Sequence, residues 1–262
     1  MIVIYTTFLR PSLVKKTMPT YLKFFNGKVL VLDQGKDEDN IEKIVRDLND
    51  SRLLYYRLPF DCGLSYARNF GVKKAKELEE KYILLTADSI ELIKPIKADK
   101  IISFLESNEN YAIVGLELKN RVLWHLDMEL KKDGWYLDLP RRPKIIFEEI
   151  EFMPCDVVKN FFIGKVDLIL DNLWDEKLKL AEHEDFFYRL KNKNYKVFYT
   201  DYLSANYIND KNPTYNSYRQ RIYSEFIPKV KEKYGIKGSY FHYSHELVEA
   251  FREWKRKNDR KT

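Results

Sequence analysis

The sequence predicts an α/β protein whose central sheet is mostly parallel and flanked by helices, with a small antiparallel excursion and a helical extension at the C-terminus. Strand-like and helix-like runs alternate through the first 120 residues, which is typical of a parallel sheet covered by helices. One apolar run, residues 82–85, is followed closely by an acidic residue, Asp88. Such sheets bind ligands at the carboxyl ends of their strands, so we expect a site there.

The elements of the first half follow from their residue patterns. Residues 2–7 form a short apolar strand, and Arg10-Pro11-Ser12 ends it and opens a helix over residues 12–25. The next segments alternate in the same way: a strand at 28–32 closed by the turn residues 33–35, a helix at 37–49, a strand at 53–58, a helix at 64–81, a strand at 82–85, a helix at 99–106 and a strand at 111–118.

The alternation changes after residue 120. Residues 122–130 and 134–139 flank an Asp-Gly pair, the usual turn of a hairpin, so an antiparallel excursion is expected. A strand is predicted at 155–163 and a helix opened by acids at 181–191. One continuous core is expected through both halves.

Composition narrows the class of protein. The chain has 262 residues, of which 45% are apolar, enough for one sizeable core. Its apolar runs are far shorter than the ~20 residues of a membrane span, and the N-terminus lacks signal-peptide features, so we expect a cytoplasmic protein. The two cysteines have neither metal-ligand spacing nor disulfide-scaffold density and are expected to be reduced thiols.

The C-terminal segment carries much of the basic charge. Leu247, Val248, Phe251 and Trp254 fall at helical spacing before a stretch rich in Lys and Arg. Such a helix could lie on an anionic inner membrane surface, or it could pack on the core with a basic end. No nucleic-acid-binding motif accompanies the charge, so a nucleic-acid partner is not expected.

Three residues in the first half suggest a nucleotide-sugar site. Asp33, at the end of a strand, could accept hydrogen bonds from a nucleoside, or it could cap the turn before Gly35. Arg68, at a helix start, could face a diphosphate, or it could be an ordinary helix arginine paired with an acid. Asp88 could hold Mg²⁺ or Mn²⁺, which prefer oxygen ligands, or it could cap the following turn.

A second acidic cluster lies late in the chain. Glu182, His183, Glu184 and Asp185 are successive, which is more than capping of a helix start requires. One of them could remove a proton from an acceptor hydroxyl. Trp174, upstream, could form an aromatic wall for a sugar or belong to the core.

In order and spacing these motifs resemble those of the GT-A fold glycosyltransferases, especially the large family 2 and the related β-1,4-N-acetylgalactosaminyltransferase-like domains. Members open with a strand and a loop bearing Thr and Arg, followed by a strand that ends in Asp. The matching parts here are residues 6–11, residues 29–33, the G-x-x-x-A-R-N segment at 63–69, the strand leading to Asp88, the V-x-N-F-F-like run at 156–163, and the W-D and E-H-E-D-F-F-Y-R-L elements at 174–190.

The resemblance implies transfer of a sugar from a nucleotide donor, usually a UDP-sugar with Mn²⁺ or Mg²⁺, to a hydroxyl of a glycan, lipid or protein. It places the nucleotide at Thr7, Arg10, Asp33 and Arg68, and the metal-bridged diphosphate at Asp88. In inverting members an acid of the late element is the general base, for which Glu182, Glu184 and Asp185 are the candidates.

The sequence departs from the family pattern at two places. Thr86 stands where the first Asp of a DxD signature would be, so that either a metal is weakly held or another residue compensates. His183 stands where family 2 has the Asp of its E-D pair, and it could itself serve as base or ligand.

Trp124 and Trp135, in the hairpin region, are expected with Trp174 to form an aromatic surface for the acceptor.

The resemblance spans roughly residues 1–210, which we assign to a glycosyltransferase domain. Residues 1–120 form its nucleotide-sugar half, residues 121–210 its acceptor and catalytic half, and residues 211–262 a helical, basic extension. Two other classes stay open: a non-catalytic nucleotide-sugar or glycan-binding protein on the same fold, and a sugar-phosphate nucleotidyltransferase. The latter normally has a Gly-rich phosphate loop after the first strand, and residues 6–12 contain no glycine.

Overall fold

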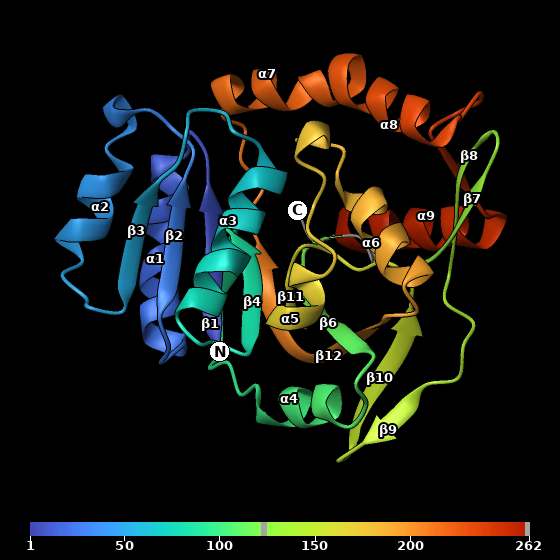
Figure 1. Cartoon of the computed structure of the whole chain (residues 1–262), viewed down its shortest axis with the longest axis horizontal. Helices are drawn as coiled ribbons and strands as arrows, with labels where there is room; N and C mark the ends of the chain where they lie inside the picture. Colours follow the sequence, from blue (N-terminus) through green and yellow to red (C-terminus); the bar gives the residue numbers. More distant parts are fainter. Residues whose placement is uncertain (122–124, 260–262) are drawn as a thin grey trace.

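The computed structural model describes residues 1–121 and 125–259, and it places most strands in one sheet (Figure 1). The order of strands in the large sheet is β3-β2-β1-β4-β11-β6-β12-β10-β9, and β5 pairs with β12. The bounds are β1 Ile2–Thr7, β2 Val29–Asp33, β3 Leu53–Arg57, β4 Tyr82–Ala87, β5 Ile90–Leu92, β6 Tyr111–Lys119, β9 Ile145–Phe147, β10 Ile150–Cys155, β11 Phe162–Lys165 and β12 Lys196–Tyr207.

Helices cover both faces of this sheet. Alternate residues of β1 point to opposite faces, so that Ile2 and Ile4 join one core cluster while Val3 and Tyr5 join the other. One face packs against α1 (Pro11–Phe24), α2 (Ile41–Asp47) and α4 (Asp99–Glu106). The other packs against α3 (Leu64–Glu77), α5 (Val166–Leu170) and α6 (His183–Asn192), and short 3₁₀ turns occur at η1 (Asp37–Asp39) and η2 (Glu176–Leu178).

The predicted fold class is confirmed. Strands β3, β2, β1 and β4 are mutually parallel, and β6 is parallel to β12. Strand β11 is antiparallel to both β4 and β6 and joins the two parallel parts into one sheet.

One predicted strand is wrong in its extent. Instead of a single strand over 155–163, β10 ends at Cys155 and β11 begins at Phe162. Asp156 breaks the strand because its carboxylate binds the Met128 backbone N–H, Arg142 and Lys191, at 2.9, 2.8 and 2.7 Å. The loop that follows carries Lys159 into a cavity described below.

The antiparallel excursion is confirmed as a small second sheet of order β13-β8-β7. Strands β7 (Asp127–Lys131) and β8 (Gly134–Asp138) form the expected hairpin, and β13 (Phe241–Tyr243) from the C-terminal segment pairs with β8. Gly134 has a φ of +151°, and a Cβ there would lie 2.1 Å from the Ser239 carbonyl oxygen. Only glycine therefore fits between the hairpin and the C-terminal segment.

The C-terminal segment is helical and packs on the rest of the protein. Helix α7 (Pro213–Arg221), the π-helical turn η3 (Ile222–Phe226) and α8 (Ile227–Tyr234) run along one edge of the molecule, and α9 (His245–Asp259) lies behind α6 (Figure 1). Leu247 of α9 is fully buried, and Phe251 packs against the core. The apolar side of the terminal helix thus faces the protein. Among the helices described, none is sufficiently long and apolar to cross a bilayer.

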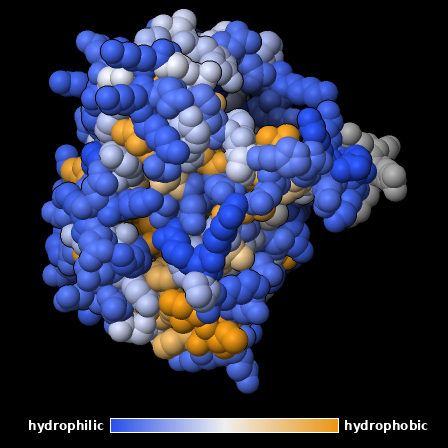
Figure 2. Space-filling model, turned by 90° about the vertical axis from the view of Figure 1, so that its right-hand side faces the viewer, coloured by the Kyte–Doolittle hydropathy of each residue, from blue (hydrophilic) through white to orange (hydrophobic). Residues whose placement is uncertain are grey.

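The edge strand β9 carries an exposed apolar side chain. Figure 2 shows a hydrophobic patch toward the bottom of a mostly hydrophilic face, the level at which β9 lies in Figure 1. Ile146 of β9 is 73% exposed. The strand is only three residues long, and Lys144, Glu148 and Glu149 flank it, features that discourage edge-to-edge pairing between molecules.

Candidate active site

A cavity of about 970 Å³ lies at the carboxyl ends of the strands. Its lining includes Thr6 and Thr7 of β1, Thr86 of β4 and Tyr207 of β12. Residues from the starts of α3 and α6 also line it, as do Tyr215, Asn216 and Arg219 of α7. This is the place where open α/β sheets bind ligands.

Helix α7 is fastened to the loops around this cavity. The Arg221 guanidinium donates to both Asp61 carboxylate oxygens, at 2.8 and 2.7 Å. Asn212 donates to the Leu9 carbonyl at 3.1 Å, and the Tyr218 ring packs edge-on against Phe8. The loop after β1 is therefore linked to the C-terminal segment across the cavity.

Thr7, Arg10 and Asp88, three of the residues expected to bind the donor, contact one another. Thr7 Oγ1 donates to Asp88 Oδ2 at 2.8 Å, and Arg10 Nε donates to the same oxygen at 3.1 Å. Arg10 Nη2 also donates to Asp88 Oδ1, so both carboxylate oxygens are engaged. Asp88 is fully buried, which raises its pKa, while the charge of Arg10 opposes that shift. Thr7 and Arg10 line the cavity, and Asp88 lies behind them.

Asp33 is also buried behind the cavity. Its Oδ1 accepts from the Gly35 backbone N–H at 2.7 Å, and its Oδ2 accepts from the Tyr55 hydroxyl at 2.8 Å. Asp33 thus caps the turn after β2, and the neighbouring Gln34 faces the cavity instead.

Arg68 and Glu182 form a buried ion pair at the wall of the cavity. Arg68 Nη1 lies 2.5 Å from Glu182 Oε1, and Glu182 Oε2 has no hydrogen-bond partner in the described structure. The next residue, Asn69, fixes the geometry because it exchanges two hydrogen bonds of 2.9 Å with the backbone of Trp174. The A-R-N motif therefore links α3 to the segment that leads into α6.

Glu184 lies at the start of α6 and lines the same cavity. Burial raises its pKa to about 7, and the nearby negative charge of Glu182 adds to this. The Tyr240 hydroxyl donates to Glu184 Oε2 at 3.2 Å. A carboxyl group with a pKa near neutrality and access to a cavity has the properties of a general base.

Glu184 is expected to make the protein less stable as the pH rises. The folded protein keeps this proton up to about pH 7, whereas the unfolded chain loses it near pH 4.3. Between these values the native state binds more protons, so the free energy of unfolding falls with rising pH, by at most about 4 kcal/mol. Urea unfolding at pH 4 and pH 8 should therefore show Glu184→Gln gaining stability relative to wild type at the higher pH.

The measurement compares wild type with Glu184→Gln because buried histidines make the free energy of unfolding rise with pH, opposite to the effect of Glu184. Burial lowers the pKa of His183 and of His125 to about 4 each, so both remove stability as the pH falls. These contributions are common to wild type and Glu184→Gln and cancel in the difference. An equal pH dependence of the two proteins would show that the pKa of Glu184 is not raised.

The other two residues of the acidic cluster differ in their surroundings. His183 lines the cavity, and its Nδ1 is buried without a hydrogen-bond partner in the described structure. Asp185 lies outside the cavity lining and is fully buried. Its carboxylate accepts from Arg189, Lys233 and Tyr234, at 2.9, 2.5 and 2.6 Å. The contacts with Lys233 and Tyr234 hold α6 against α8.

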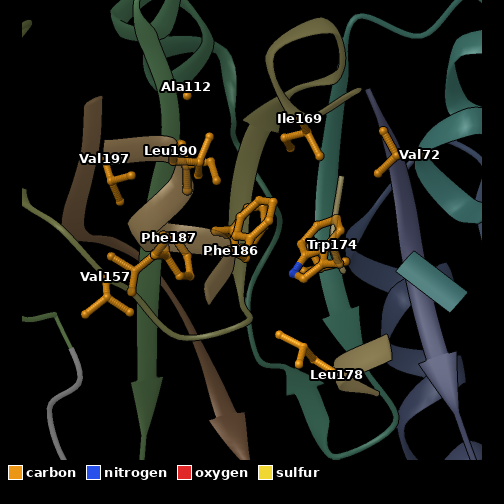
Figure 3. Packing of buried hydrophobic residues seen from close by; sticks show 14 of the residues in the cluster. Val72, Ala112, Val157, Ile169, Trp174, Leu178, Phe186, Phe187, Leu190 and Val197 are labelled. Atoms are coloured by element: carbon orange, nitrogen blue, oxygen red, sulfur yellow. The ribbon is translucent and has the colours of Figure 1, made fainter. Parts of the chain in front are cut away.

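The predicted aromatic surface for the acceptor is not assembled by the described residues. Trp174 stacks on Phe186 with ring centroids 4.0 Å apart, within the core between α3 and α6 (Figure 3). Trp135 is fully buried against Tyr188 and Tyr234. Trp124 lies outside the described residues. The aromatic residues that do line the cavity include Tyr207, Tyr215, Tyr223 and Tyr240.

Three cationic residues of the cavity were missed by sequence reasoning. Arg121 follows β6, Lys159 lies in the loop between β10 and β11, and Arg219 belongs to α7. They come from separate elements and share no local motif. Only the fold brings them together.

A divalent metal does not fit the residues that surround Asp88. Both Asp88 oxygens already accept hydrogen bonds from Arg10 and Thr7, and Thr86 lies 2.5 Å from the Tyr21 hydroxyl. The described residues contain no group of three His, Cys, Asp or Glu side chains that could hold a metal ion. The expected site for Mn²⁺ or Mg²⁺ on Asp88 is therefore not supported by the contacts of this residue.

Solved structures of glycosyltransferases share this architecture. One is GalNAc-T7 with UDP, GalNAc and Mn²⁺, at a TM-score of 0.63 and 13% identity over 79% of this chain and 43% of that one. Another is the mannosyltransferase PcManGT from Pyrobaculum calidifontis with GDP-Man and Mn²⁺, at a TM-score of 0.60 and 11% identity over 88% of this chain and 64% of that one. A third is S. aureus TarS 1–349 with UDP, at a TM-score of 0.54 and 15% identity over 86% of this chain and 64% of that one. The chain thus has the GT-A fold, and it spans under two thirds of each of these three chains.

The family follows from the sequence match. The model of glycosyl transferase family 2 matches residues 3–156, more than half of the chain. The protein belongs to this family. No match was found among curated protein sequences.

Proposed function

We propose that the protein transfers a sugar, a hexose or an N-acetylhexosamine, from a nucleoside-diphosphate donor to a hydroxyl of a glycan, lipid or protein, with inversion. UDP-sugars are the first donors to test. The observation that carries the proposal is Glu184: a buried carboxyl group with a pKa of about 7 that faces the cavity at the carboxyl edge of a GT-A sheet. The family and the ligands of the similar structures support the donor class.

In the proposed reaction Glu184 removes the proton from the acceptor hydroxyl. The acceptor oxygen forms a bond to the anomeric carbon while the bond to the nucleoside diphosphate breaks, and the bonding electrons leave with the diphosphate. Tyr240 holds the Glu184 carboxylate through its hydroxyl. Glu182 and Arg68 are proposed to position the reacting groups, and no step of this mechanism passes through a metal.

The donor is proposed to lie along Thr7, Arg10 and Arg68, which line the cavity. Asp33 and Asp88 would not touch the donor themselves. Asp88 would hold Thr7, which lines the cavity, in place, and Asp33 would hold the turn after β2. The residues of the late acidic cluster also have different proposed roles. Asp185 would stabilise the packing of α6, whereas Glu184 would contact the substrate.

A donor screen tests the proposal. Purified protein is incubated with UDP-, GDP- and CDP-sugars and with glycan or lipid-linked acceptors, and the release of nucleoside diphosphate is measured. Release that depends on both donor and acceptor is expected. Binding of a nucleotide without any release would favour the non-catalytic binding protein, and release of pyrophosphate from a nucleoside triphosphate and a sugar phosphate would favour the nucleotidyltransferase.

Contact with the cytoplasmic surface of an anionic membrane is also part of the proposal. Lys255, Arg256 and Lys257 of α9 are exposed, and each basic residue near such a surface contributes about 1 kcal/mol. The protein should sediment with phosphatidylserine vesicles more than with phosphatidylcholine vesicles, and the triple change of these residues to Glu should abolish the difference. Equal sedimentation of wild type and variant would contradict the contact.

A further inference from the structure

We propose that Arg121, Lys159 and Arg219 bind the diphosphate of the donor and neutralise it during transfer, in the role that a divalent metal would otherwise fill. This inference rests on the proposed function, because it assigns the diphosphate of the same donor to a place in the same cavity. It agrees with the contacts of Asp88, whose oxygens already accept hydrogen bonds from Thr7 and Arg10.

The cavity has more positive than negative side chains. Among the described residues its lining includes five Arg or Lys side chains, Arg10, Arg68, Arg121, Lys159 and Arg219, and three Asp or Glu side chains, Glu182, Glu184 and Asp210.

Two of the five cations are already neutralised. Arg10 is paired with Asp88, and Arg68 is paired with Glu182. Both pairs are buried, so their net charge toward a ligand is close to zero.

The other three cations have no acidic partner in the described part of the chain. Arg121 lies over the ring of Tyr207, 4.1 Å from its centroid, which orients the guanidinium without removing its charge. Lys159 and Arg219 likewise form no ion pair with any described residue.

These cations act on one another across the cavity. Burial lowers the pKa of Lys159 to about 7, the positive charge of Arg121 contributes to that shift, and the negative charge of Glu117 opposes it. Burial also lowers the pKa of Arg68, and the positive charge of Arg219 lowers it further. Like charges that line one cavity without salt-bridge partners among the described residues repel each other, and a bound anion reduces this repulsion.

The three residues come from three directions. Arg121 follows β6, Lys159 lies in the loop before β11, and Arg219 projects from the α7 helix that borders the cavity. A diphosphate offers several oxygens to which guanidinium and ammonium groups can donate charge-assisted hydrogen bonds. Bound to all three, it would also hold α7 over the donor.

The test is calorimetric binding of UDP, GDP and CDP, each measured in EDTA and with added Mn²⁺. We expect at least one nucleoside diphosphate to bind in EDTA with nearly the affinity that it has with Mn²⁺. Arg121→Gln, Lys159→Met and Arg219→Gln should each weaken that binding by about tenfold. The same substitutions should weaken binding of the corresponding nucleoside monophosphate much less. Inorganic pyrophosphate should compete with the nucleoside diphosphate for binding to the wild type.

Arg46→Gln is the matched control, because it also removes one positive charge but lies on the exposed side of α2, outside the cavity. Thermal unfolding of each variant identifies any that fails to fold, and the three positions on separate elements provide independent tests.

Two results would overturn the inference, and they differ. Binding that requires Mn²⁺ and is unchanged in all three variants would refute the cationic diphosphate site while leaving the proposed transfer intact. Binding of no nucleotide under either condition would refute the proposed function and this inference together.

Discussion

Glu184→Gln is expected to lower the rate of sugar transfer by about 10²- to 10⁴-fold, the usual contribution of a general base. Glutamine has nearly the shape of glutamate and can still accept from the Tyr240 hydroxyl, but it cannot take a proton from the acceptor. Binding of the donor nucleotide should change little. At saturating donor, where the bound diphosphate keeps Lys159 protonated, transfer by the wild type should increase as the pH rises through about 7, because the Glu184 carboxyl group must lose its proton to act.

Two neighbouring substitutions distinguish this role from a structural one. Asp185→Asn disturbs contacts to Arg189, Lys233 and Tyr234 and should lower thermal stability, with a smaller effect on the rate of the folded enzyme. Glu182→Gln tests the competing base, since Glu182 Oε2 is buried and has no partner among the described residues. If Glu182→Gln abolished transfer while Glu184→Gln retained it, the assignment of the base would be wrong.

The first half of the fold was predictable because its elements are locally consistent. Strands β1, β2 and β4 each begin with a run of at least four apolar residues that is buried on both faces, and helix α4 has the predicted bounds, Asp99–Glu106. Strand β12 was not predicted. It is twelve residues long, but exposed and polar residues interrupt its apolar pattern, and its pairing with β6 shifts register between Thr200 and Ser204. Tertiary pairing, rather than local preference, determines this strand.

The candidate site was predictable only in part. The late acidic cluster and the Arg68 segment were recognised from local motifs, and the fold does bring Glu182 and Arg68 together over 114 positions of sequence. The partner of Asp88 could not be read locally, because Arg10 precedes it by 78 positions and meets it only in the parallel pairing of β1 with β4. For the same reason Arg121, Lys159 and Arg219 have no sequence signature.

Arg68→Met is expected to lower the free energy of unfolding by about 3 to 5 kcal/mol, the largest stability effect that we predict. The side chains of Arg68 and Glu182 are only 5% and 2% exposed, so removing the guanidinium leaves a buried carboxylate without its partner. The energy comes less from the attraction within the pair than from the cost of an unpaired charge in the interior. Urea denaturation measures the change.

A double-mutant cycle separates these two contributions. Glu182→Gln should also destabilise, because Arg68 would keep a buried charge that Arg219 already repels. The double variant Arg68→Met with Glu182→Gln should cost less than the sum of the single changes, because neither leaves an unpaired charge when both are made. Additive effects would refute a buried, coupled pair.

The matched control is an exposed ion pair with similar geometry. Lys76 Nζ lies 2.7 Å from Asp167 Oδ1, but the two side chains are 57% and 73% exposed. Water already solvates both charges there, so Lys76→Met should change stability by less than about 1 kcal/mol. A similar loss for Arg68→Met would mean that the Arg68–Glu182 pair is solvated in the folded protein. The cavity wall would then be hydrated at the point where the proposed mechanism places two positioning residues.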